Sequence, residues 1–188
     1  MIYDRIASYL RGDFDAQPER IAWAEAFAAD KAAKSLRRCF VDPRNDSGRA
    51  PVSASSHFYC ARNLHYLLTC APKEESQPRA KMVFHLGDNV ETMAVYLAIL
   101  AGVPIVTPKA DAVQRSVSLV MGGEPLPGHI DMTIDYMGAE CPVEVKSMSE
   151  YGWEKSRDEG VEDTFGYLTQ LQFYMAALKA PRGFFLGV

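Results

Sequence analysis

Hydrophobic and polar residues alternate along residues 129–136 in a pattern that predicts a β-strand. Every second residue from Ile130 to Tyr136 is apolar, and the residues between them are polar or charged. Because successive side chains of a strand point to opposite faces, this period is typical of a strand with one buried face. Gly138 then supplies a turn, and residues 141–148 are predicted to return as a second strand.

Apolar residues recur every three or four positions in several other segments, a period that predicts amphipathic helices. The predicted helices cover residues 1–11, 18–40, 53–70, 81–101 and 162–180. Further strands are predicted at residues 103–107, 112–121 and 183–188, with loops at residues 42–52, 122–127 and 147–163. The helix 81–101 has a broad apolar face that includes Met82, Val83 and Leu86.

This order of elements predicts an α/β or α+β fold in which helices flank a central mixed β-sheet. With 188 residues, of which 48% are hydrophobic, the chain suits one globular domain with a sizeable core. We expect residues 1–52 to form a helical N-terminal extension of that domain.

The net charge of −4 excludes a generally basic nucleic-acid binder, so any contact with DNA has to rely on a local basic groove and on metal. Lys31 and Lys34 lie in the basic end of the helix 18–40, which fits the negative end of a helix dipole; contact with DNA is the alternative. The sequence has no run of about 20 apolar residues, the length that a membrane span requires, and its N-terminus lacks the apolar core of a signal peptide. A soluble, cytoplasmic protein is therefore expected.

Charged residues of the two predicted strands 129–136 and 141–148 can converge. Glu144 and Lys146 are two positions apart and share a face, and Asp131 on the preceding strand can lie beside them. Two carboxylates next to an ammonium suit a hard divalent cation and an attacking water, which is the chemistry of a nuclease. The alternative is an exposed Glu144–Lys146 charge pair with a solvated Asp131.

Glu91 is a second acidic candidate, within the helix 81–101. It lies among apolar neighbours, where an unpaired carboxylate would be costly, so it requires a partner. His85 and Asp88 lie about one turn before it and can share its side of the helix. The pattern indicates a metal site or a polar network.

Four motifs occur in a fixed order along the chain. They are Ser53-Ala54-Ser55 through Cys60-Ala61-Arg62, Gly87 through Glu91, Asp131 followed by Glu144-Val145-Lys146, and Gln170 through Tyr174. In this order they resemble the S-x-S…C-x-R, G-x-x-x-E, D…E-x-K and Q-x-x-x-Y motifs of the PD-(D/E)XK nuclease superfamily. The resemblance is to its RecB-like exonuclease branch, which includes CRISPR-associated and phage enzymes.

The resemblance implies a restriction-endonuclease-like core and a metal-dependent deoxyribonuclease. Asp131 and Glu144 would bind Mg²⁺ or Mn²⁺, with the Val145 carbonyl and Glu91 completing the shell, and Lys146 would orient the attacking water. Gln170 and Tyr174 would steady the DNA backbone near the cut.

Two further residues are candidates for DNA contact. Arg62 belongs to the S-x-S…C-x-R segment, and Trp153 either stacks on an unpaired base or packs over the sheet. The expected substrate is single-stranded or end-containing DNA. The alternatives are a structure-specific or restriction-type endonuclease and a catalytically silent subunit that binds DNA or protein.

The four cysteines have no C-x-x-C spacing, which favours reduced thiols over a zinc site or disulfides. The resemblance does not imply an iron–sulfur cluster, because relatives that hold one place three of its four cysteines after the Q-x-x-x-Y helix, and here no cysteine follows Cys141. The resemblance also suggests a homo-oligomer or a recombination, replication or CRISPR partner, in a bacterial, archaeal or phage-infected cell.

Overall fold

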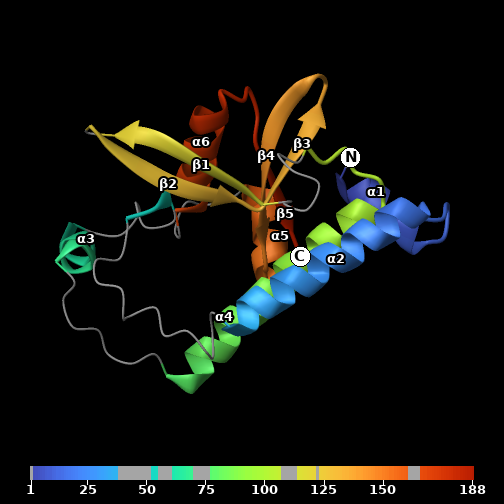
Figure 1. Cartoon of the computed structure of the whole chain (residues 1–188), viewed down its shortest axis with the longest axis horizontal. Coiled ribbons are helices and arrows are strands. Elements are labelled where there is room, and N and C mark those ends of the chain that lie inside the picture. The colour runs from blue at the N-terminus through green and yellow to red at the C-terminus, as the bar shows by residue number, and fades with distance from the viewer. Residues whose placement is uncertain are drawn as a thin grey trace.

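The described part of the protein is a mixed α/β structure, shown in Figure 1. The computed structural model describes residues 2–37, 52–54, 61–69, 77–106, 114–121, 123–160 and 166–188. Its helices are α1 (Ile2–Leu10), α2 (Pro18–Leu36), α3 (Ala61–Leu68), α4 (Pro78–Leu100), α5 (Glu150–Glu159) and α6 (Tyr167–Leu178). Its strands are β1 (Arg115–Met121), β2 (Glu124–Ile130), β3 (Met132–Tyr136), β4 (Ala139–Lys146) and β5 (Phe184–Gly187).

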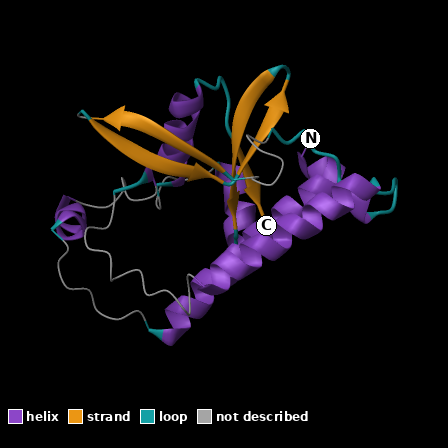
Figure 2. Cartoon of the chain, in the orientation of Figure 1, coloured by secondary structure: helices purple, strands orange, loops and turns teal. Residues whose placement is uncertain are grey.

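These strands form two small sheets, whereas the sequence predicted one central sheet. β1 and β2 pair as an antiparallel ribbon, and β4 lies between an antiparallel β3 and a parallel β5. The predicted strand 129–136 is divided at Asp131, because β1 pairs with the chain up to Ile130 and β4 pairs with it from Met132 onward. Figure 2 shows the two sheets diverging from this point.

The hairpin between β3 and β4 confirms the turn predicted at Gly138. Tyr136 pairs with Ala139, so the loop consists of Met137 and Gly138 alone. Both residues have positive φ, 57° and 80° respectively. Positive φ at both loop residues is the geometry of the type I′ turn, whose twist matches that of an antiparallel hairpin.

β4 is the central strand of the larger sheet and is covered on both faces. Its residues from Cys141 to Val145 are all buried. Val143 and Val145 join the main core, where α4 packs on the sheet, and α6 contacts β4 as well. The main core comprises Ile2, Ala24, Phe27, Ala94, Val95, Ala98, Ile99, Leu100, Val103, Met132, Ile134, Cys141, Val143, Val145 and Leu186.

The two N-terminal helices belong to this same core. α2 lies along α4 in Figure 1, and Phe27 and Ala24 of α2 are buried in the main cluster together with Ile2 of α1. α2 begins at Pro18, where the missing N–H and fixed φ of proline suit a first helical turn. Residues 38–51 of the predicted extension lie outside the described residues.

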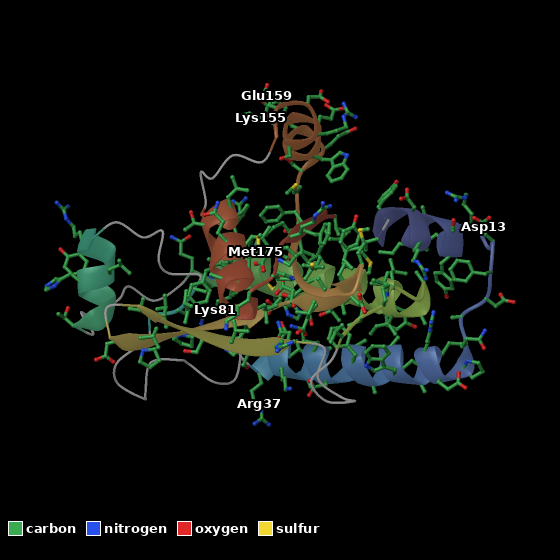
Figure 3. The ribbon with its side chains drawn as sticks, turned by 90° about the horizontal axis from the view of Figure 1, so that it is seen from above. Asp13, Arg37, Lys81, Lys155, Glu159 and Met175 are labelled. Atoms are coloured by element: carbon green, nitrogen blue, oxygen red, sulfur yellow. The ribbon has the colours of Figure 1, made fainter. Side chains whose placement is uncertain are left out.

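Two segments that were predicted as loops form regular elements. Most of the predicted loop 122–127 belongs to β2, because a two-stranded ribbon leaves one edge unpaired and tolerates Pro125 and Pro127. Most of residues 147–163 form α5, whose first turn is capped by Ser149 Oγ accepting from the amide of Gly152 at 3.1 Å. Figure 3 shows α5, which carries the labelled Lys155 and Glu159, projecting on the side opposite Arg37 of α2.

Other boundaries differ in smaller ways. The predicted strand 103–107 contributes only an isolated bridge between Ile105 and Ile134 among its described residues. The helix predicted over residues 53–70 is described only as α3, because residues 55–60 and 70 lie outside the described residues. α4 begins at Pro78, again a proline in the first turn, rather than at residue 81.

The first half of α4 exposes much of its predicted apolar face. Met82, Val83 and Leu86 are 59%, 59% and 63% exposed. The buried positions of this helix, from Ala94 onward, lie in its second half, where it packs against the sheet. No helix among the described residues is both long enough and apolar enough to cross a membrane.

Candidate functional site

Asp131 lies at the junction between β2 and β3, where the backbone changes its pairing partner. Its side chain is buried, and its Oδ2 accepts a hydrogen bond from the amide of Val145 on β4 at 2.9 Å. Among the described residues, the pairing between β3 and β4 ends at Met132 and Val143. The carboxylate of Asp131 therefore satisfies the amide of Val145, which would otherwise be left buried and unpaired. The division of the sheet therefore fixes Asp131 against β4.

Glu144 and Lys146 lie on one face of β4, as the spacing predicted. Lys146 Nζ donates to Glu144 Oε1 at 2.6 Å. The Glu144 side chain is 2% exposed and the Lys146 side chain is 18% exposed. The alternative of a solvated surface pair with a solvated Asp131 is wrong, because both carboxylates are buried.

α6 supplies the polar residues that face this pair. Gln170 Oε1 lies 3.4 Å from Lys146 Nζ, and Gln170 Nε2 donates to Tyr174 Oη at 2.9 Å. Tyr174 Oη in turn donates to the carbonyl of His129 at 2.8 Å. Burial, together with the charge of Glu144, raises the pKa of Tyr174, so its hydroxyl remains a donor at neutral pH. A hydrogen-bonded chain thus runs from β4 through α6 to β2.

Two residues that the sequence pattern did not predict, Tyr167 and Gly128, complete this arrangement. The ammonium of Lys146 lies 4.7 Å from the ring centre of Tyr167, within the range of a cation–π contact. A Cβ added at Gly128 would lie 2.7 Å from Tyr174 Cε1, so only glycine lets the ring approach β2 this closely. The spacing of Tyr167, three residues before Gln170, was the available signal for its place on the same helix face.

The two oxygens of Glu144 have different surroundings among the described residues. Oε2 is buried and has no hydrogen-bond partner among the described residues, whereas Oε1 is held by Lys146. Burial, and then the charges of Glu144 and Glu91, raise the pKa of Asp131 well above its usual value. Burial also raises the pKa of Glu144, against the opposing effect of Lys146. The site therefore places two buried carboxyl groups beside one ammonium.

This surplus of buried carboxylate fits a hard divalent cation. Oxygen donors are the ligands that Mg²⁺ and Mn²⁺ prefer, and the unpaired Oε2 of Glu144 is such a donor. Asp131 is held beside the same strand and supplies a second carboxylate. Val145, expected to contribute its carbonyl, is observed to contact Asp131 through its amide.

Glu91 borders the site but faces another partner. Its Oε1 accepts from Lys31 Nζ of α2 at 2.7 Å and from Gln114 Nε2 at 3.1 Å. Within the described ranges, no three His, Cys, Asp or Glu side chains are grouped to hold a metal ion. The structure therefore brings Asp131 and Glu144 together and turns Glu91 toward Lys31.

Of the other two predicted DNA contacts, Arg62 lies apart from this site, whereas Trp153 packs beside Gly187, the register partner of Lys146. Arg62 is exposed on α3, which Figure 1 and Figure 3 both place apart from β4 and α6. Trp153 is 44% exposed on α5 and packs on β5, where a Cβ added at Gly187 would lie 2.7 Å from its ring. For Trp153 the structure favours packing over the sheet. Residues 55–60 of the S-x-S…C-x-R segment, which include Cys60, lie outside the described residues.

No protein-family model matches this chain, nor does any curated protein or solved structure with which it was compared.

Proposed function

We propose that this chain is a Mg²⁺- or Mn²⁺-dependent nuclease that hydrolyses phosphodiester bonds of DNA from an end. The observation that supports it best is the buried, unpaired Oε2 of Glu144, held beside Asp131 and the ammonium of Lys146. A structural ion pair would not require a second buried carboxylate with a raised pKa.

Each residue of the site has a separate role in this proposal. Asp131 and Glu144 would hold the cation, and Lys146 would orient a water and offset the charge that develops on the phosphate. When bound, the cation supplies Lewis acidity and lowers the pKa of the attacking water. From α6, Gln170 positions Lys146 directly and Tyr174 does so through Gln170. This role adds to their expected contact with the DNA backbone.

We further propose that β3, β4 and β5 belong to a restriction-endonuclease-like core of the PD-(D/E)XK type. In its support, the E-x-K residues lie on the central strand and the preceding aspartate lies at the start of its antiparallel neighbour. A recombination, replication or CRISPR partner, a homo-oligomer and a cytoplasmic location remain predictions.

A catalytically silent DNA- or protein-binding subunit is the second candidate. The observation in its favour is the ion pair between Glu91 and Lys31, which occupies the third expected ligand. The silent subunit would bind DNA without cutting it, whether or not metal is present. An endonuclease would differ in cutting circular DNA.

Digestion of end-labelled linear and circular DNA, single-stranded and duplex, tests these alternatives in Mg²⁺, Mn²⁺ or EDTA. We expect Lys146→Ala and the shape-preserving Glu144→Gln to lower the rate on linear DNA by about 10²-fold or more. Lys34→Ala is the matched control, because Lys34 is an exposed lysine paired with Asp30. Equal cleavage by wild type and both site variants would exclude the proposed site, and binding without cleavage by the wild type would favour the silent subunit.

A further inference from the structure

Lys31 and Glu91 form an ion pair between α2 and α4 at the border of the acidic site. The two side chains are 16% and 18% exposed, so the pair is largely shielded from water. Gln114 donates to the same Oε1 atom that Lys31 holds. One oxygen of Glu91 is thus bound by two donors that come from different elements.

Glu91 is also close enough to the acidic pair to act on it. Its charge contributes to raising the pKa of both Asp131 and Glu144. A pocket of about 130 Å³ is lined by Glu91 together with Lys31, Asp88 and Gln114 among others. Glu91 therefore borders both the acidic site and an open space that Lys31 also lines.

On the basis of the proposed function, we infer that Lys31 is a competing counterion for the divalent cation. Its ammonium neutralises Glu91 and competes for this carboxylate with a cation that takes it as a ligand. Lys31 Nζ holds Oε1 at 2.7 Å, and a cation about 2.1 Å from either oxygen of the same carboxylate is repelled by that ammonium. Asp88 lines the same pocket, and its carboxylate, whose Oδ2 accepts from Ser35 Oγ at 2.6 Å, is a second acidic group for the ammonium to face. Lys31 would therefore weaken metal binding and act as a positioning residue through Glu91.

The test is the affinity of the full chain for Mn²⁺, measured by calorimetry and by the loss of the free-Mn²⁺ paramagnetic resonance signal. We expect Lys31→Met to tighten Mn²⁺ binding by about three- to tenfold. Lys31→Arg, which keeps the charge, should restore nearly the wild-type affinity. Lys34→Met should leave the affinity unchanged, because Lys34 lines the same pocket but pairs with Asp30.

A cycle with Glu91→Gln shows whether the effect acts through this carboxylate. In the Glu91→Gln background, Lys31→Met should no longer change the affinity. Unchanged or weaker Mn²⁺ binding by Lys31→Met would overturn the inference. Lys31→Gln, which keeps a donor to Glu91 without the charge, gives the same readout if Lys31→Met does not fold.

The outcomes separate this inference from the proposed function. If the wild type binds Mn²⁺ and the variants behave as expected but no DNA is cut, the proposed function fails and the inference stands. If DNA is cut and Lys31→Met binds Mn²⁺ as the wild type does, the inference alone fails. If the wild type binds no Mn²⁺, both fail.

Discussion

The backbone amide of Val145 donates to Asp131 Oδ2 at 2.9 Å, so β4 holds the carboxylate that immediately precedes β3. Val145 lies between Glu144 and Lys146 on β4. Its amide therefore ties the carboxylate of Asp131 to the part of β4 that carries Glu144 and Lys146.

Replacing Asp131 by asparagine should change the pH dependence of stability. Because the folded pKa of Asp131 is raised, its protonated form favours folding at acidic pH. That stability is lost as the pH rises from about 4, the usual carboxyl value, through the raised pKa. Asp131→Asn cannot ionise and still offers an oxygen to Val145, so it should be more stable than wild type at pH 7 and similar at pH 4.

Urea denaturation in EDTA between pH 4 and pH 8 measures this difference. The control is the same series with Mn²⁺, which should stabilise the wild type more than the variant, because a ligand that binds the folded state raises its stability. A variant less stable than wild type at pH 7 in EDTA would contradict the raised pKa of buried Asp131.

Gly128→Ala should destabilise the protein by about 1–3 kcal/mol, the usual cost of overpacking. The added methyl group would lie 2.7 Å from Tyr174 Cε1 and 2.9 Å from Ala54 Cβ, so the ring has to move away from β2. The movement should weaken the hydrogen bond between Tyr174 and the His129 carbonyl. Urea denaturation measures the change in stability.

Gly87→Ala is the matched control for that change. Gly87 lies within α4, and a Cβ there would have nothing within 4 Å. Alanine should therefore stabilise the helix by up to about 1 kcal/mol. Equal effects of the two substitutions would contradict the close approach of Tyr174 to Gly128.

Met137→Asn should stabilise the hairpin between β3 and β4 by roughly 0.5–1 kcal/mol. Met137 has a φ of 57° and is 86% exposed, so its side chain contributes little packing while its backbone is strained. Asparagine adopts this conformation more readily than other non-glycine residues. Met137→Val, whose branched side chain fits it poorly, should have the opposite sign. Thermal denaturation of the three proteins checks the order.

Local periodicity was sufficient to predict the parts of the site that lie within one element. Glu144 and Lys146 share a face because residues two apart in a strand must do so, and Gln170 and Tyr174 meet because residues four apart in a helix are neighbours. The turn at Gly138 followed from the requirement for positive φ.

Features that depend on distant partners could not be predicted in this way. Lys31 is 60 positions from Glu91, and its place in a basic helix end gave no sign of a buried partner. The division of the strand at Asp131 depends on which segments pair on either side, and an alternating pattern is the same in one sheet or two. The prolines of β2 also made a strand hard to predict there, because proline is tolerated only in a strand with an unpaired edge.

Asp131 separates the residue pairs of the β1–β2 ribbon from those between β3 and β4. Every registered pair of the ribbon lies before this residue, and every pair between β3 and β4 lies after it. α6 connects the two parts, because it packs on β1 and on β4. A shift of this helix would therefore move the support of the ribbon and, through Gln170, the surroundings of Lys146 at the same time.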